Sequence, residues 1–207
     1  MKKTLLLGLA VAASAARADI IISNLANSTA PTQASQSLAT DRIKTIGFTM
    51  GGSARLVTQL TLRVSHYDSM FPNYDPVVEL CANNASAPGA VLGSFTTGSA
   101  ITGTPSDLLF TPTSSITLAA GGSYFLKVSS TAPAGLPGMD WWINSAADGY
   151  TGLASYGSSL FSQDSGATWP NSGRQNVFQL EGQPVPEPAS LAALGLGLAA
   201  VARRRRS

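Results

Sequence analysis

The residues of this chain that could do chemistry are few and far apart. His66 is the only histidine, and the only cysteine is Cys81. A Ser-His-Asp triad built on "HYD" would need a nucleophilic serine on a G-x-S-x-G turn, but in "GLASYG" Ser155 stands at the wrong spacing. We therefore expect His66 to be a hydrogen-bonded residue at the edge of the core. We predict that the chain is not an enzyme.

Cys81 closes the apolar run "VVELC", which is typical of a strand. A single cysteine can form no disulfide within its own chain, and no neighbour in the sequence would lower the pKa of its thiol. One histidine and one distant cysteine are also too few for a structural zinc site of ordinary ligand count. We expect an inert, buried thiol.

Oxygen-bearing side chains gather in "HYDSMFPNYDPVVE", which holds Asp68, Asn73, Asp75 and Glu79. Hard oxygen ligands on an extracellular loop suit Ca²⁺, although the spacing differs from that of an EF-hand. Side chains of Asp and Asn that cap turns explain the same residues. Two interpretations stay open: a calcium site at Asp68, Asp75 and Glu79, or no cofactor at all.

The stretch "SQDSGATW" resembles the Asp-box of sialidases and other propeller proteins, S-x-D-x-G-x-T-W. Ser162, Asp164, Gly166, Thr168 and Trp169 supply its positions. Propellers repeat the box across several blades and need a much longer chain. We interpret the single copy as a tight hairpin in which the Asp accepts turn amides and the Gly adopts a positive φ.

Carbohydrate binding is suggested by "MDWWIN". Adjacent residues of a strand point to opposite faces, so of Trp141 and Trp142 one should lie in the core and the other outside. An exposed Trp, with Trp169, Tyr150 and Tyr156 downstream, could stack on sugar rings. The possible glycan contacts are thus Trp141, Trp142, Trp169 and Tyr150. The alternative is that the loop after the two tryptophans covers both.

The first 18 residues have the pattern of a secretory signal peptide. Lys2 and Lys3 precede an apolar stretch that is rich in Leu, and Ala16 and Ala18 supply a small-x-small cleavage pattern. Signal peptidase would then leave a mature chain that begins at Asp19, and the protein would be exported.

The other end of the chain carries an apolar segment, residues 189–202, followed by four arginines (Arg203, Arg204, Arg205 and Arg206). As a helix the segment would span about 21 Å, which is short of a hydrocarbon core of about 30 Å. The arginines would stay on the cytoplasmic side and set the topology. We expect a transient hold in the inner membrane, with the body outside.

Pro186, Glu187 and Pro188, followed by a short Ala/Leu/Gly segment and a terminal Arg cluster, resemble the PEP-CTERM sorting signal of Gram-negative bacteria. The resemblance implies that an exosortase, a membrane cysteine protease, recognises the tail of residues 189–207 and removes it near this motif. Residues 183–188 form the proline-rich linker that precedes the tail.

The body between the two ends is sparsely charged. Residues 19–183 hold six basic and ten acidic residues, a net charge of −4. Binding to nucleic acid requires a cationic face that displaces counterions from the phosphates. The charge balance therefore argues against a nucleic-acid partner.

Alternation with a period of two recurs along the body, and no stretch keeps a helical period. In "RLVTQLTLRVSH", Leu56, Leu60, Leu62 and Val64 share one face, as in a half-buried antiparallel strand. Similar runs are "IKTIGFTM", "YFLKVS" and "NVFQLEG". With turn signals between them, they predict an all-β fold: an antiparallel, jelly-roll-like β-sandwich over residues 19–182, flanked by a signal helix and a short C-terminal hydrophobic helix.

"ELCANNASAPGAVLGSFTT", "ITLAAGGSYFLKVSS" and the closing "FQLEGQPVPEP" are similar to the choice-of-anchor modules, type R above all. That resemblance implies an exported β-sandwich and brings no catalytic residues. We expect a cell-surface or extracellular-matrix structural protein associated with exopolysaccharide. The alternative is a carbohydrate-binding module that uses exposed Trp and Tyr, and a third class is a calcium-dependent adhesin or a glycosidase-like enzyme.

Overall fold

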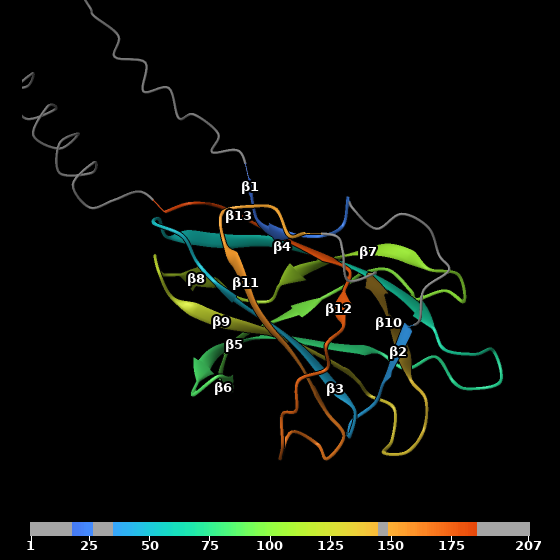
Figure 1. Cartoon of the computed structure of the whole chain (residues 1–207). Helices are drawn as coiled ribbons and strands as arrows, with labels where there is room; N and C mark the ends of the chain where they lie inside the picture. Colours follow the sequence, from blue (N-terminus) through green and yellow to red (C-terminus); the bar gives the residue numbers. More distant parts are fainter. Residues whose placement is uncertain (1–17, 27–34, 145–148, 186–207) are drawn as a thin grey trace, which may run out of the picture.

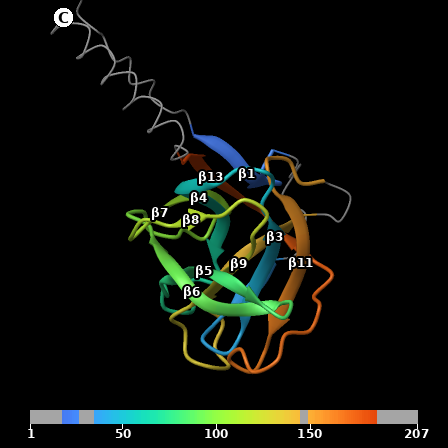
Figure 2. The ribbon, with the colours of Figure 1, turned by 90° about the vertical axis from the view of Figure 1, so that its left-hand side faces the viewer.

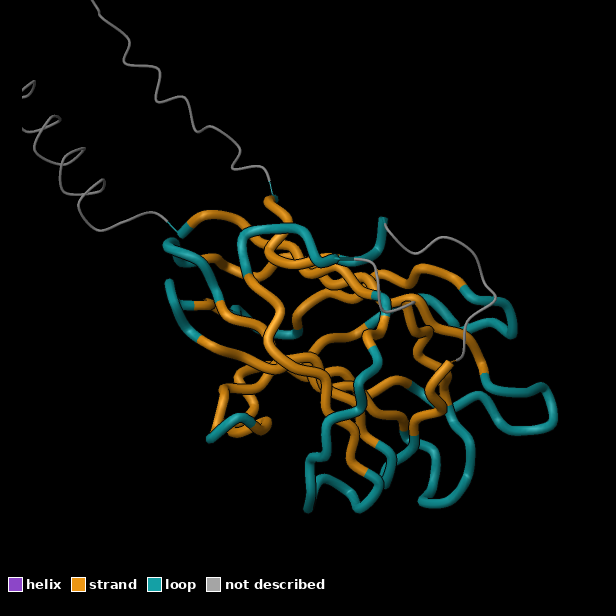
Figure 3. Tube along the Cα trace, in the orientation of Figure 1, coloured by secondary structure: helices purple, strands orange, loops and turns teal. Residues whose placement is uncertain are grey.

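The computed structural model describes residues 18–26, 35–144 and 149–185. Strands run throughout this part of the chain and it contains no helix (Figure 3). The predicted signal peptide, apart from Ala18, and the predicted C-terminal helix lie outside the described residues. The strands are β1 (Asp19–Ser23), β2 (Ser35–Leu38), β3 (Ile43–Thr49), β4 (Arg55–His66), β5 (Pro76–Asn84), β6 (Ala87–Thr96), β7 (Ser106–Pro112), β8 (Thr117–Leu118), β9 (Ser123–Ser130), β10 (Met139–Asn144), β11 (Ser155–Ser162), β12 (Gln175–Asn176) and β13 (Phe178–Pro184).

The strands form one antiparallel sheet in the order β1-β13-β4-β7-β6-β5-β9-β3-β11. Two short pairings between β6 and β7, Phe95 with Pro112 and Thr96 with Thr111, join its two halves. Strand β10 extends the first half, since it pairs with the end of β4, with β2 and with β12. The prediction of an antiparallel all-β fold is confirmed.

At the outer edges of this order, β1 meets residues 151–154, which lead directly into β11. The amides of Ser23 and Thr151 each donate to the other's carbonyl at 2.8 Å, and the Ala154 amide donates to the Ile21 carbonyl at 2.7 Å. The sheet is therefore nearly closed and barrel-like (Figure 2). The spacing of strands and turns had suggested a sandwich, but spacing alone does not determine whether two sheet edges meet.

The long strand β4 lies between β13 and β7 and carries much of the core. Leu60, Leu62 and Val64 are buried on one face, as predicted. The prediction for Leu56 was wrong, because Val57 is the buried residue there, with 3% of its surface exposed. Gln59 pairs with Glu181 and Val57 with Gly182, so the intervening Thr58 forms a β-bulge that reverses the alternation.

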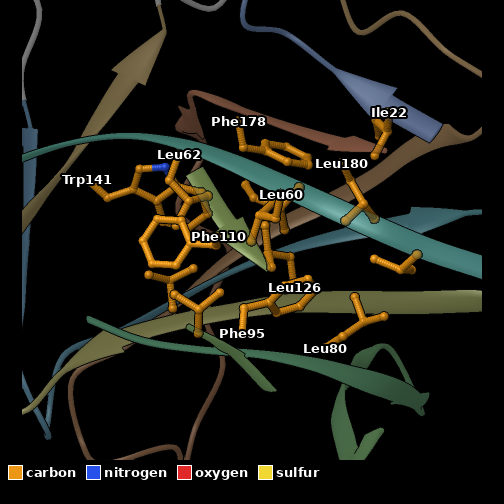
Figure 4. Close-up of a cluster of buried hydrophobic side chains, with 14 of the residues drawn as sticks. Ile22, Leu60, Leu62, Leu80, Phe95, Phe110, Leu126, Trp141, Phe178 and Leu180 are labelled. Carbon is orange, nitrogen blue, oxygen red and sulfur yellow. The ribbon is translucent and has the colours of Figure 1, made fainter. Parts of the chain in front are cut away.

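Aromatic and branched side chains from both halves of the sheet fill the interior (Figure 4). Trp141 is completely buried, its ring lies edge-on to Phe178 at 6.4 Å, and its indole N–H donates to the Val177 carbonyl at 2.9 Å. Apolar residues of the other alternating runs are buried as well: Ile46, Phe48, Met50, Tyr124, Leu126, Val128, Phe178 and Leu180. Burial of each large apolar side chain contributes about 1.5–3 kcal/mol.

A second, smaller cluster lies on the opposite face of β5 and β9. Cys81 and Phe125, which pair across these strands, pack with Leu160 of β11, and the half-buried Trp169 lies against them. Their neighbours Leu80 and Leu126 belong to the main core. Because successive residues of a strand face opposite sides, this second cluster lies outside the barrel.

The two ends of the barrel differ in what they carry. Asp19 pairs with Gly182, and Pro184 pairs with Arg55, so the described chain enters and leaves at one end, which we call the proximal end. The loops after β4, β9 and β11 (residues 67–75, 131–138 and 163–174) lie at the opposite end, which we call the distal end (Figure 1).

Candidate functional site

The hairpin after β11 at the distal end has the predicted Asp-box structure. Asp164 Oδ1 accepts hydrogen bonds from Ser162 Oγ at 2.7 Å and from the Thr168 amide at 2.9 Å, while Oδ2 accepts from Thr168 Oγ1 at 2.5 Å. Gly166 has a φ of +91°, which side chains disfavour. The hydrogen bonds from Thr168 and Ser162 lower the pKa of Asp164 to about 2. The carboxylate therefore stays ionised and holds the turn.

A pocket of about 420 Å³ opens beside this hairpin. Its other wall is the segment that follows the hairpin, which runs back along β11: the Phe161 amide donates to the Pro170 carbonyl at 3.0 Å, and the Ser172 amide donates to Ser159 at 2.9 Å. Phe161, Gln163, Asp164, Thr168, Asn171 and Ser172 are among the residues that line it. Aromatic, amide, hydroxyl and carboxylate groups thus face one open space.

A buried lysine supports the pocket wall. Lys44 of β3 is completely buried, and its Nζ donates to Ser172 Oγ and, at 3.1 Å, to the Arg174 carbonyl. Ser159 Oγ lies 3.0 Å from Ser172 Oγ. Burial, and secondarily the nearby Arg174 charge, lower the pKa of Lys44 to about 7. The hydrogen bonds of the amino group fasten residues 172–174 to the barrel.

Sequence reasoning missed this pocket and the lysine beneath it. A usable signal was present in "IKTIGFTM", where Lys44 alternates in step with Ile46 and Phe48. Its side chain therefore lies on the same face of β3 as theirs, which is the core face. A charged residue at an inward position needs hydrogen-bond partners. Those partners come from a segment some 130 residues away, which the local pattern does not contain.

The four aromatic residues that were predicted as possible glycan contacts do not share a surface. Trp141 is a core residue, so it is unavailable at the surface, whereas Trp142 is half-buried and donates to Ser65 Oγ at 2.9 Å. Their opposite environments agree with the predicted alternation. Tyr150 stacks on Tyr156 at 4.6 Å, and burial raises the pKa of its hydroxyl. Trp169 covers the outer cluster.

The carboxylates of the calcium interpretation do not converge. Glu79 pairs with Lys127 at 2.6 Å, and Asp68 accepts from the Met70 amide at 3.0 Å, which is a turn-capping contact. Across residues 18–26, 35–144 and 149–185, no group of three His, Cys, Asp or Glu side chains is placed to hold a metal ion. Asp75 is exposed on the same loop.

His66 and Cys81 have the surroundings that the sequence suggested. His66 Nε2 lies 2.9 Å from the Pro72 carbonyl, within a loop contact at the end of β4. Cys81 is fully buried, and burial raises the pKa of its thiol. The prediction of a buried thiol is confirmed, and its inertness stays a prediction.

The comparison with protein families decides the nature of the C-terminal segment. Residues 184–206 match the model of the PEP-CTERM protein-sorting motif. The chain carries a PEP-CTERM sorting signal. Proteins with this motif are exported, processed by an exosortase and sorted to the cell surface. No curated protein matches the chain.

The PEP-CTERM motif begins at Pro184, the last residue of β13, so the signal follows the barrel directly. Pro186, Glu187, Pro188 and the arginines at 203–206 lie outside the described residues. Within the part that the structure describes, no helix has the length and apolar character needed to cross a membrane.

Proposed function

We propose that this chain is a non-catalytic structural protein of the cell surface or extracellular matrix. It is made with a cleaved signal peptide, held briefly in the inner membrane by its tail, and released to the envelope or its exopolysaccharide by an exosortase. The PEP-CTERM motif at residues 184–206 carries this proposal.

The placement of the chain ends supports display at a surface. The described chain leaves the barrel at the proximal end, directly before the sorting motif, so a tail held in the membrane places the distal loops on the far side of the domain (Figure 1). The loops of that end hold Asp68, Asp75 and Asp164 against one cation, Arg174, and their hydroxyl and amide side chains suit contact with hydrated polymer. A matrix role requires a stable, presented domain and no reactive group.

Intact-mass analysis of the protein recovered outside the cells tests the proposal. We expect a species that begins at Asp19 and lacks Arg203–Arg206. A Glu187→Ala variant should keep its arginines and stay in the membrane fraction, whereas Asp75→Ala, which changes an exposed carboxylate of the body, should be processed normally. Recovery of protein outside the cell that still carries the four arginines would contradict the proposal.

Binding to carbohydrate is the second candidate function. The observation that favours it is the open distal pocket, which combines an aromatic ring with amide, hydroxyl and carboxylate groups. This location differs from the Trp and Tyr residues that the sequence suggested.

A further inference from the structure

The shape of the distal pocket is fixed by contacts within the protein. One wall is the Asp-box hairpin, held by the hydrogen bonds of Asp164 to Ser162 and Thr168. The other wall is held by backbone bonds to β11 and by the buried Lys44. A preformed site loses little conformational entropy on binding. Its volume of about 420 Å³ lies within the range of about 300–1,000 Å³ that is usual for small-molecule sites.

Several groups that line the pocket keep hydrogen-bonding capacity. Gln163 is exposed and makes no hydrogen bond to any described residue. Asn171 uses its Oδ1 to accept the Gly173 amide at 2.9 Å, which leaves both hydrogens of its amide nitrogen available. Asp164 Oδ2 accepts one hydrogen bond, from Thr168, and has a further lone pair. Two amides and one carboxylate can therefore donate to and accept from the same ligand.

The pocket also offers an aromatic surface. Phe161, at the end of β11, packs against the main core, and the part of it that remains exposed lines the same space. A flat ring beside amides and a carboxylate matches the two sides of a sugar unit, whose C–H groups form an apolar face and whose hydroxyls form a polar rim.

The charges of the pocket narrow the choice of ligand. The carboxylate of Asp164 is its one ionised lining group, and the nearby Lys44 amino group is buried and donates to Ser172 Oγ and to the Arg174 carbonyl. An anion would meet this negative charge with no cation among the lining residues, since the exposed Arg174 is not part of the lining. Ca²⁺ prefers six to eight oxygen ligands, including several carboxylates, and one carboxylate is a poor match. A neutral ligand rich in hydroxyl groups fits this lining.

We propose that the distal pocket binds one or two sugar units of a neutral polysaccharide through Phe161, Gln163, Asp164 and Asn171. The inference rests on the proposed function, because a domain presented at the cell surface meets such polymers on its distal side. It adds the class of ligand and the residues that contact it.

Isothermal titration tests this on the whole chain, expressed with its own leader and tail and then purified. The probes are neutral tetrasaccharides of glucose, galactose, mannose and N-acetylglucosamine. We expect saturable binding of at least one of them. Loss of one amide contact in Gln163→Ala should weaken binding about tenfold, and the bulky ring of Gln163→Trp should abolish it.

Gln183→Ala is the matched control, since it removes an amide from β13 at the proximal end. It should bind as the unaltered protein does, and all three variants should keep the melting temperature within a few degrees because neither glutamine lies in the core.

Absence of saturable binding for all four tetrasaccharides at millimolar concentration would overturn the proposal. Undiminished binding by Gln163→Trp would overturn it as well. Because the titration uses purified protein, absence of sugar binding would not contradict the sorting proposal. Equally, arginines that remain on the exported protein would contradict the sorting proposal and leave the measured sugar binding unaffected.

Discussion

The two ends of the barrel are stabilised in different ways. At the proximal end, β1 pairs with β13 and residues 151–154 close the seam against β1, so backbone hydrogen bonds dominate. At the distal end, backbone bonds such as that from the Ser172 amide to the Ser159 carbonyl are joined by side-chain bonds of the Asp-box carboxylate and the buried Lys44. The proximal end therefore secures the closure of the barrel, while the distal end holds irregular loops in a fixed shape. This difference predicts that the two ends respond differently to substitution and to pH.

The largest expected effect comes from the seam at the proximal end. Gly152 has a φ of +122°, and an added Cβ would lie 2.5 Å from the Ile21 carbonyl oxygen. Gly152→Val should therefore lower the free energy of unfolding by about 3 kcal/mol or more, through backbone strain and a broken seam. Urea denaturation measures the loss.

Gly52→Ala is the control for the seam, because a Cβ there meets no atom within 4 Å and the φ is unstrained. It should change stability by less than about 0.5 kcal/mol. Equal stability of the Gly152 and Gly52 variants would show that the seam does not hold the barrel together.

The distal end should respond to pH through Lys44. The pKa of this residue is about 7 in the folded protein and 10.5 as the ordinary value, so the unfolded chain binds more protons between these values. Stability should therefore rise with pH from about 7 to 10.5, by up to about 1.4 kcal/mol per pH unit. Urea denaturation across this pH range tests the slope.

Lys44→Met fills the same space without an ionisable group and should flatten that part of the stability curve. Lys127→Met, which removes a lysine paired with Glu79 on the sheet surface, should keep the slope. A slope that persists in Lys44→Met would assign the pH dependence to another group.

Thr168→Val tests the hydrogen bonds of the Asp-box. It removes the hydroxyl that donates to Asp164 Oδ2, which should lower the free energy of unfolding by less than Gly152→Val does. It should also raise the pKa of Asp164, which is depressed to about 2 chiefly by this hydrogen bond. The stability that Asp164 contributes is present above its ordinary pKa of 3.8 and is lost as the pH falls toward 2.

An NMR titration of the Asp164 carboxyl carbon follows the change in its pKa. Thr111→Val, which replaces an exposed threonine of β7, is the control and should leave the Asp164 titration unchanged. An unaltered pKa in Thr168→Val would mean that the Ser162 hydroxyl and the backbone donors hold the carboxylate without the Thr168 hydroxyl.

The smallest effect is expected at the distal loop after β4. Met70 has 80% of its side chain exposed, so Met70→Ser removes almost no buried surface. The free energy of unfolding should change by less than about 0.5 kcal/mol. A larger loss, measured by thermal melting, would mean that this loop supports the barrel in the same way as the Asp-box does.

Patterns that are local in the sequence were predicted well. Period-two alternation identified the strands that contain Leu60, Leu126 and Phe178, and the Asp-box spacing identified its hairpin. Each of these features is determined by residues within about ten positions of one another. The PEP-CTERM motif is of the same kind, since it is contiguous and ends near the C-terminus.

Features that depend on contacts between distant segments were missed. The bulge at Thr58 is visible only in its register against β13, and the barrel seam joins β1 to residues 151–154. The pocket likewise combines β11, the hairpin and a returning segment that Lys44 holds in place. Propensity and spacing contain no information about such partners, so the candidate site could not be assembled from the sequence.

The outer cluster gives the molecule a natural reporter of its own motions. Cys81 is a buried thiol in this cluster, and the Trp169 side chain packs against the same cluster, so we expect that opening of the hairpin that carries Trp169 exposes the sulfur to a thiol-specific reagent. The rate of alkylation of Cys81 would therefore report how often that hairpin opens. Slower labelling in the presence of a sugar would reveal occupancy of the neighbouring pocket without any engineered dye or tag.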